Sequence, residues 1–197
     1  FKPLWLQLTV QGRNAVKSVL DEDEKQCLKY ANLIEPEIDA SAVSWWDDIA
    51  AFARAERSYQ QILTGREGER KSIEYEKERL KRIGILEEPI WQALDDSTAG
   101  YDILSYNYNE YKQKEELMIE VKTSRYSPIQ INITQNEWRV AQQSASRYIF
   151  HIWELGSNTL RILTVSEIER HIPENRNAGK WTEARIKLPS ILEDVMY

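Results

Sequence analysis

Two short segments, residues 100–103 and 119–122, constrain the fold of this 197-residue chain more than any other part of it. Their sequences, Gly-Tyr-Asp-Ile and Ile-Glu-Val-Lys, predict the two strands of one hairpin, with a turn over residues 96–100 before the first strand. Side chains two residues apart on a strand project from the same face. We therefore expect Glu120 and Lys122 to share one face, while the aliphatic residues between and before them pack into a core.

Three charged side chains then meet at one point of the hairpin, because Asp102 lies near the start of the first strand and Glu120 and Lys122 lie on the second. Two carboxylates supply hard oxygen ligands for a divalent cation, and an ammonium group beside them suits a phosphate. This is the chemistry of phosphodiester hydrolysis. Singly, a Glu-x-Lys or Gly-x-Asp pattern is more often a solvated strand face, so the expectation depends on the order, separation and strand context of these residues.

The composition narrows the class of protein. With 42% hydrophobic and 29% charged residues the chain is typical of globular proteins, and no apolar run is long enough to cross a bilayer. The single cysteine, Cys27, excludes an intrachain disulfide and a cysteine-rich zinc site, and it favours a reducing, cytoplasmic setting. The net charge of −6 argues against a broad nucleic-acid-binding surface, although the acids of a metal site would contribute to it. Because the chain starts at Phe1 rather than Met, we expect it to be part of a longer protein.

The chain divides by pattern into a helical N-terminal extension, residues 1–57, and an α/β domain, residues 58–197. After two punctuating glycines, Gly65 and Gly68, a helix is expected over residues 69–83. A Thr-x-x-Glu capping box at residues 134–137 predicts a second helix to about residue 146. Strands are expected at residues 89–94, 101–106, 116–123, 148–155, 160–165 and 184–188, with a short extended segment at 129–133 and a short helix at 166–171. From residue 69 to 155 the order is helix, three strands, helix, strand, which is an αβββαβ core with a mixed central sheet.

This order, with Asp on the second strand and Glu-x-Lys on the third, resembles the PD-(D/E)XK nuclease superfamily. More narrowly, residues 65–165 resemble the nuclease-like domain named after the C-terminal region of the plant protein NO VEIN. The superfamily's first motif often has Pro before Asp, and Tyr101 stands there in this chain. The residues that carry the narrower resemblance are Gly68, Glu69, Tyr75, Glu76, Leu80, Gly100, Tyr101, Asp102, Ile103, Leu104, Ser105, Ile119, Glu120, Val121, Lys122, Thr134, Asn136, Glu137, Trp138 and Ala141.

The resemblance implies a restriction-endonuclease-like α/β fold and a metal-dependent DNA endonuclease, part of a larger restriction or anti-phage defence protein. It assigns Asp102 and Glu120 to Mg²⁺ or Mn²⁺, with the Val121 carbonyl as a further ligand. It implies that Lys122 orients the attacking water and stabilises the charge on the phosphoryl group. It implies that Glu69 binds a second ion or a metal-bound water. In the competing interpretation, Glu69 is an acid in the first turn of a helix that stabilises the helix start.

Gln135 and Asn136 would lie near the substrate backbone in a functional reading, whereas helix capping followed by a core tryptophan is the simpler interpretation of that segment. The implied partners are DNA, other domains of the larger protein and a second copy of the chain, since nucleases that cut both strands often pair; no membrane is implied. Two alternatives remain open. One is a catalytically silent module of the same fold that binds nucleic acid or a protein partner, and the other is an α/β interaction domain whose motifs are coincidental.

Overall fold

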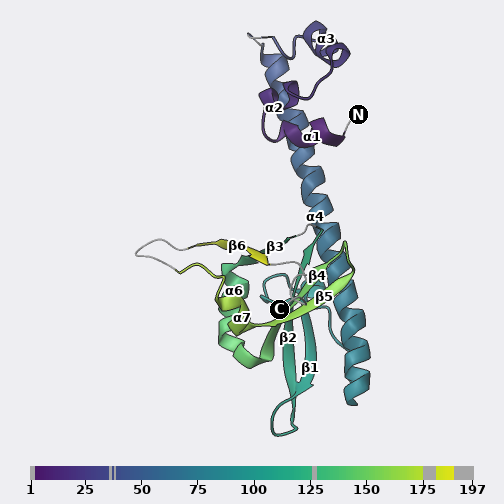
Figure 1. Cartoon of the computed structure of the whole chain (residues 1–197), viewed down its shortest axis with the longest axis vertical. Coiled ribbons are helices and arrows are strands. Elements are labelled where there is room, and N and C mark those ends of the chain that lie inside the picture. Colours follow the sequence, from purple (N-terminus) through teal and green to yellow (C-terminus); the bar gives the residue numbers. More distant parts are fainter. Residues whose placement is uncertain (1–2, 36, 38, 126–127, 175–180, 189–197) are drawn as a thin grey trace. The chain divides into compact units, whose positions relative to one another are not determined.

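The computed structural model describes residues 3–35, 37, 39–125, 128–174 and 181–188, and the chain divides into two compact units, Phe1–Leu63 and Thr64–Tyr197. The sequence pattern predicted this division between residues 57 and 58. The first unit is helical, with α1 (Pro3–Thr9), α2 (Arg13–Lys17), α3 (Glu22–Tyr30) and the first part of α4 (Ala40–Ile83) (Figure 1). Within it the indole N–H of Trp46 donates to the Leu33 carbonyl at 2.8 Å. No helix in the described ranges is long and apolar enough to span a membrane.

The second unit is built on a mixed four-stranded sheet in the order β1-β2-β4-β5 (Figure 1). Strands β1 (Ile103–Tyr108) and β2 (Lys114–Ser124) form an antiparallel hairpin, β2 runs parallel to β4 (Tyr148–Glu154), and β4 pairs antiparallel with β5 (Thr159–Thr164). A parallel pair needs a crossover connection. Here β3 (Ile129–Thr134), α6 (Gln135–Ser144) and the short helix η1 (Ala145–Arg147) provide it, and β3 pairs separately with β6 (Glu183–Leu188).

Both faces of the main sheet are covered. On one face Ile119, Val121 and Trp153 pack with Ile73 of α4. On the other face, residues of β4 pack with α6, with α7 (Val165–Glu169) and with alternate residues of the β3–β6 pair. Alternation along β2 therefore places Glu120 and Lys122 on the α6 side of the sheet, opposite to the aliphatic residues that meet α4.

Helix α4 continues without a break through Gly65 and Gly68, where the sequence analysis began a separate helix. A Cβ atom added at Gly68 would overlap the Oγ1 atom of Thr123 on β2. The glycine therefore lets the helix approach the sheet closely, and it does not mark a helix end. The inward face of this part of α4 buries Ser72, Glu76 and Leu80.

The chain is a mixed α/β protein with the expected αβββαβ order, but the strands are not all the expected ones. The prediction of a strand at residues 89–94 is wrong. Ile90 makes one isolated bridge with Leu104, and α5 (Gln92–Asp95) follows at once. Pro89 has no N–H to donate, and the Ile90 carbonyl also accepts from Gln92, which turns the chain into the helix. The third strand of the core is β3, where only a short extended segment was expected.

Candidate active site

Asp102 lies one residue before β1 and is fastened to β2 on both sides of Glu120. Its main-chain N–H donates to the Ile119 carbonyl at 3.0 Å, and its Oδ2 atom accepts from the Val121 N–H at 2.8 Å. The last regular pair of the hairpin is Ile103 with Ile119, so Asp102 and Glu120 occupy the next pair of positions. Residues at directly opposite positions have Cβ atoms about 4.5–5.5 Å apart. The structure therefore brings these two carboxylates together.

Lys122 forms ion pairs with two acids. Its Nζ atom lies 2.7 Å from Oε1 of Glu120 and 2.8 Å from Oε2 of Glu137. Glu137 is the third residue of α6, and its Oε2 atom also accepts from the Thr134 N–H at 3.0 Å, which completes the capping box. The sequence predicted that box but missed the contact with Lys122, because a Thr-x-x-Glu motif already accounts for the glutamate and gives no signal of a further partner.

Tyr148 is a second residue of the site that the sequence analysis missed, since it resembles the many packing aromatics of the chain. Its buried hydroxyl donates to the Gly100 carbonyl at 2.8 Å and lies 3.4 Å from Oε2 of Glu120. Gly100 has a φ of +80°, and a Cβ atom there would run into the side chain of Val140. Glycine is thus required at the turn that leads into Asp102.

Burial and like charge act together on the two opposed carboxylates. Burial raises the pKa of Asp102 to about 6, and the carboxylates of Glu69 and Glu137 add to the rise. Burial also raises the pKa of Glu120 well above its ordinary value; the Lys122 ammonium opposes this shift, and Asp102 adds to it. Each of the two desolvated carboxylates disfavours the charged form of the other, so a bound cation would stabilise the charged form of both.

Lys122 is held as an ammonium group. Burial lowers its pKa, but the carboxylates of Glu120 and Glu137 raise it by more, so the net shift of the Lys122 pKa is upward. Burial and the Glu120 carboxylate also raise the pKa of Tyr148, which stays a hydroxyl donor. A fixed positive charge suits the stabilisation of a phosphate, whereas a general base would need a pKa close to neutral.

Glu69 lies in the interior of α4, buried, and close enough to Asp102 to raise the pKa of that acid. Its Oε2 atom accepts from Nη1 of Arg66 at 2.6 Å and from the indole N–H of Trp91. The interpretation of Glu69 as a first-turn acid is wrong, because α4 begins at Ala40. Its carboxylate stands beside the site, with Arg66 and Trp91 as its partners.

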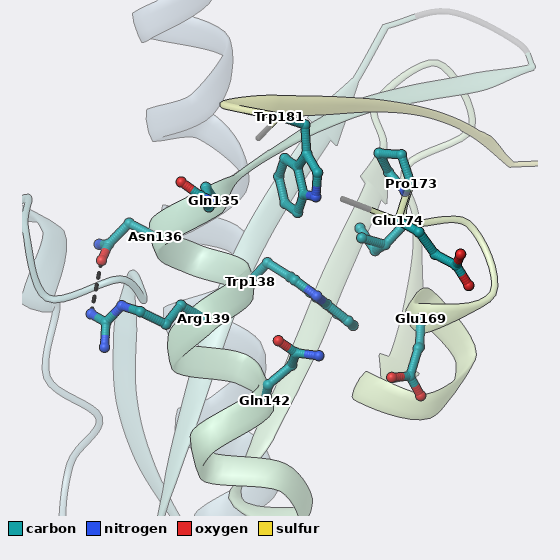
Figure 2. Close-up of a pocket in the computed structure, with 10 residues that line it drawn as sticks. Gln135, Asn136, Trp138, Arg139, Gln142, Glu169, Pro173, Glu174 and Trp181 are labelled. Atoms are coloured by element: carbon teal, nitrogen blue, oxygen red, sulfur yellow. Dashed lines mark hydrogen bonds between the residues drawn. The ribbon is translucent and has the colours of Figure 1, made fainter. Parts of the chain in front are cut away.

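Gln135 and Asn136 occupy the first turn of α6, directly before Glu137. The main-chain N–H of Gln135 donates to the Thr182 carbonyl at 2.9 Å, and Nδ2 of Asn136 donates to the Thr98 carbonyl at 3.2 Å. Both residues line a pocket along α6 (Figure 2). They share the first turn of α6 with Glu137, and none of the hydrogen bonds found for them in the described ranges reaches Asp102, Glu120 or Lys122.

Within the residues that the structure describes, no three His, Cys, Asp or Glu side chains are already grouped as they would be around a metal ion. The donors present nevertheless fit Mg²⁺, which keeps several waters and needs only one or two carboxylates with substrate oxygens. Asp102 and Glu120 supply two such carboxylates at opposed positions of the hairpin. Their raised pKa values are the electrostatic sign of a place where a cation would be favoured.

Comparison with known proteins identifies the domain. A family model described as Protein NO VEIN, C-terminal, matches residues 68–165. No curated protein and no solved structure matches the chain. The matched range runs from the Gly68 contact in α4 to the end of β5, and it contains Glu69, Asp102, Glu120, Lys122, Glu137 and Tyr148. Through residues 68–165, the chain belongs to the family of the NO VEIN C-terminal domain.

Proposed function

We propose that this domain hydrolyses phosphodiester bonds in DNA, with Mg²⁺ or Mn²⁺ held by Asp102 and Glu120. The observation that carries the proposal is the pair of hydrogen bonds that fastens Asp102 to the residues on either side of Glu120, with the Lys122 ammonium 2.7 Å from Glu120. Burying two acids and a lysine together is costly for folding. Strongly shifted acids of this kind are more frequent at functional sites than elsewhere, which supports a catalytic use.

Each residue of the cluster has a separate task in this proposal. Asp102 and Glu120 would hold the ion, and the Val121 carbonyl would add an oxygen. The ion would supply a water of lowered pKa and offset negative charge on the phosphoryl oxygens. Lys122, kept protonated, would contact a phosphate oxygen and orient the attacking water.

Two glutamates would act around this centre. Glu137 is a positioning residue, because it holds the Lys122 ammonium from the side of α6 at 2.8 Å. Glu69 would bind a second ion or a metal-bound water, after its carboxylate gives up its contact with Arg66 or with Trp91.

The setting follows from the same proposal. The domain would act in the cytoplasm as part of a larger restriction or anti-phage defence protein, whose other domains bring the DNA to it. Two copies would cooperate where both strands are cut. A single cysteine, Cys27, suits a reducing compartment, and the family match over residues 68–165 supports a domain of defined boundaries.

A second function, binding of nucleic acid or a protein partner without catalysis, is favoured by one observation. The Lys122 ammonium lies between two carboxylates, at 2.7 and 2.8 Å, which is the arrangement that a purely structural ion cluster would have. A buried cluster of this kind can be kept for fold specificity alone. In that case Lys122 would never contact a phosphate.

Nicking of supercoiled plasmid DNA by the full chain in Mg²⁺ or Mn²⁺ separates the two functions. The Glu120→Gln and Lys122→Ala variants should each cut at least about 100-fold more slowly. Glu116 is an exposed acid on the same strand, so Glu116→Gln is the matched control and should cut like the unaltered chain. Salt-sensitive DNA binding without cleavage in any of these proteins would support the silent module.

A further inference from the structure

The turn at residues 96–100 leads into the first acid of the proposed site, and two side chains from other elements hold it. Nδ2 of Asn136 on α6 donates to the Thr98 carbonyl at 3.2 Å. The hydroxyl of Tyr148 on β4 donates to the Gly100 carbonyl at 2.8 Å. The turn is therefore bound at two points, two residues apart, to α6 and to β4.

The packing around Gly100 leaves the turn little space to move towards α6. A Cβ atom added at Gly100 would lie 2.6 Å from Cγ2 of Val140 and 3.2 Å from Nδ2 of Asn136. Asp102 follows two residues later, and its Oδ2 atom accepts from the Val121 N–H at 2.8 Å. Because so few residues separate the turn from this contact, a displaced turn would move the Asp102 carboxylate as well.

Tyr148 also lies beside the second acid of the proposed site. Its hydroxyl is 3.4 Å from Oε2 of Glu120, while the Lys122 ammonium lies 2.7 Å from Oε1 of that carboxylate. A tyrosine hydroxyl has one hydrogen to donate. The Gly100 carbonyl, at 2.8 Å, is the closer of the two acceptors within reach. Tyr148 thus links the turn before Asp102 to the carboxylate of Glu120.

The side chain of Tyr148 is itself held in the core. Tyr148 is the first residue of β4 and opposes Met118 of β2 in the parallel register. It is 1% exposed, and its ring centroid lies 5.3 Å from that of Phe150. A side chain whose conformation is fixed by packing can hold a neighbouring ligand in one geometry. Because the hydroxyl is buried, it can act on the two acids but is out of reach of a DNA strand.

We propose that Tyr148, supported by Asn136, is a positioning residue for the metal ion: it holds Asp102 and Glu120 so that one divalent cation can bind both. The inference rests on the proposed function, because it takes these two acids to be the metal ligands. Hydrogen bonds from outside the ligand set fix the orientation of ligating side chains, and their removal typically lowers metal affinity or activity about 10- to 100-fold. Neither Tyr148 nor Asn136 is itself a ligand of the ion in this arrangement.

Binding of Mn²⁺ to the full chain, followed by the electron paramagnetic resonance signal of free Mn²⁺, tests the proposal without relying on cleavage. Tyr148→Phe keeps the ring and removes the hydroxyl, and it should raise the dissociation constant for Mn²⁺ at least about tenfold. A residue that only stabilises the fold would behave differently. Its loss would lower the midpoint of urea unfolding and leave the Mn²⁺ affinity of the folded protein unchanged.

Tyr75→Phe is the matched control. Tyr75 is a partly buried tyrosine of α4 whose ring packs edge-on to His151, so its variant should bind Mn²⁺ like the unaltered chain. Nicking of plasmid DNA gives a second readout. The Mn²⁺ concentration for half-maximal nicking should rise in Tyr148→Phe by the same factor as the dissociation constant. The KM for DNA should stay unchanged, because the hydroxyl is buried.

A second variant, Asn136→Ala, decides the question if Tyr148→Phe does not fold, since Asn136 is exposed and its loss spares the core. Asn136→Ala should also weaken Mn²⁺ binding. The effect should be smaller than that of Tyr148→Phe, because Asn136 holds the turn at Thr98, two residues further from Asp102 than Gly100 is.

Unchanged Mn²⁺ affinity in both variants, in a chain that binds Mn²⁺ and nicks plasmid DNA, would overturn the inference and leave the proposed function standing. Unchanged affinity in Asn136→Ala has the same meaning where Tyr148→Phe is unfolded. An unaltered chain that neither binds Mn²⁺ nor nicks DNA would overturn the inference and the proposed function together.

Discussion

At the scale of single residues, the site depends on how Lys122 is held. Its ammonium group bridges strand β2 and helix α6, with Glu120 on one side and Glu137 on the other. Both contacts are short, and both acids are largely buried. The lysine is thus a structural link between β2 and α6, and under the proposed function it is also the positive charge that contacts the phosphate; variants can separate these two roles.

Lys122→Ala should destabilise the protein as well as stop cleavage. The substitution leaves two carboxylates desolvated without their cation, which typically costs about 3–5 kcal/mol in free energy of unfolding. The double variant Lys122→Ala/Glu120→Gln should recover part of that loss, because one unpaired charge has gone. Urea unfolding at neutral pH measures both. A double variant no more stable than the single one would contradict the ion pair.

Glu137→Gln should slow cleavage with little change in KM, because glutamine can still complete the capping box but carries no charge to hold Lys122. We expect a loss of about tenfold in kcat, part of what removal of a full charge contact costs. Thr134→Ala is the matched control, since it removes the other half of the box, at about 1 kcal/mol of stability, and keeps the contact with Lys122. Equal kcat in the two variants would show that Glu137 acts only as a cap.

The sequence was sufficient for some residues of the site and insufficient for others. The sequence predicted that three residues lie together, namely Asp102, Glu120 and Lys122. Side-chain alternation along a strand and pairing within one hairpin are enough to determine which of them are neighbours. Glu137 could not be predicted, because its contact depends on where α6 lies over the sheet, and Tyr148 could not, because its contacts depend on the pairing of β4 with β2. Both are set by tertiary packing and leave no local pattern in the sequence.

At the scale of elements, the close approach of α4 to β2 explains why a glycine lies inside a long helix. Gly68→Ala should destabilise the protein by about 1–3 kcal/mol, because the new Cβ atom would overlap the Thr123 side chain. Gly65→Ala is the matched control, since its Cβ atom would meet only Oε1 of Glu69 at 3.8 Å. Alanine is preferred to glycine in a helix interior, so Gly65→Ala should stabilise by up to about 1 kcal/mol.

Thermal or urea unfolding of the two variants checks this pair. If the two substitutions change the free energy of unfolding in opposite directions, packing and not helix propensity decides the cost at Gly68, because both glycines lie in the same helix, three residues apart. If both substitutions stabilise, α4 does not approach Thr123 as described. This is also why the sequence analysis misplaced the helix start: a glycine signals a helix end and a close helix–strand contact equally well.

The strands show the same limit. The hairpin of β1 and β2 follows from alternation along the chain. The expected strand at residues 89–94 failed because the Ile90 main chain is satisfied by one bridge to Leu104 and a turn into α5. Strand β3 alternates buried isoleucines with exposed residues, but its partner is β6, about fifty residues later in the chain. Partner choice of that kind is not encoded locally.

At the scale of the whole domain, a second cluster of buried polar side chains, besides that of Asp102, Glu120 and Lys122, lies between α4 and the sheet. It is on the face of the sheet opposite to Glu120. The Glu76 carboxylate accepts hydrogen bonds from the Arg79 guanidinium and from the Ser105 hydroxyl, the latter at 2.5 Å. His151 of β4 is fully buried, with Nε2 3.8 Å from Oε1 of Glu76 and its ring edge-on to Tyr75. Burial lowers the pKa of His151 to about 4.

Because His151 is buried in its neutral form, we expect the protein to lose stability in mild acid. Its pKa falls from an ordinary 6.5 to about 4 on folding, so between these values the unfolded chain binds more protons. The stability present above pH 6.5 is therefore lost as the pH falls towards 4, by about 2 kcal/mol between about pH 7.5 and pH 5.

His151→Gln removes this contribution without adding a charge. Urea unfolding at both pH values should show a smaller acid loss in the variant by that amount. The raised pKa values of Asp102 and Glu120 act in the opposite direction, but both proteins share them, so the difference isolates the histidine. Identical pH dependence in the two proteins would contradict a neutral, buried His151.

The central claim is that Asp102 and Glu120 can share one divalent ion beside Lys122. Anomalous diffraction from a crystal of the domain soaked in Mn²⁺ tests it most directly. We predict one strong peak within coordination distance of both carboxylates, with the Lys122 amine adjacent to it. A structure in which Mn²⁺ binds elsewhere, or nowhere, while Lys122 still bridges Glu120 and Glu137, would contradict the claim.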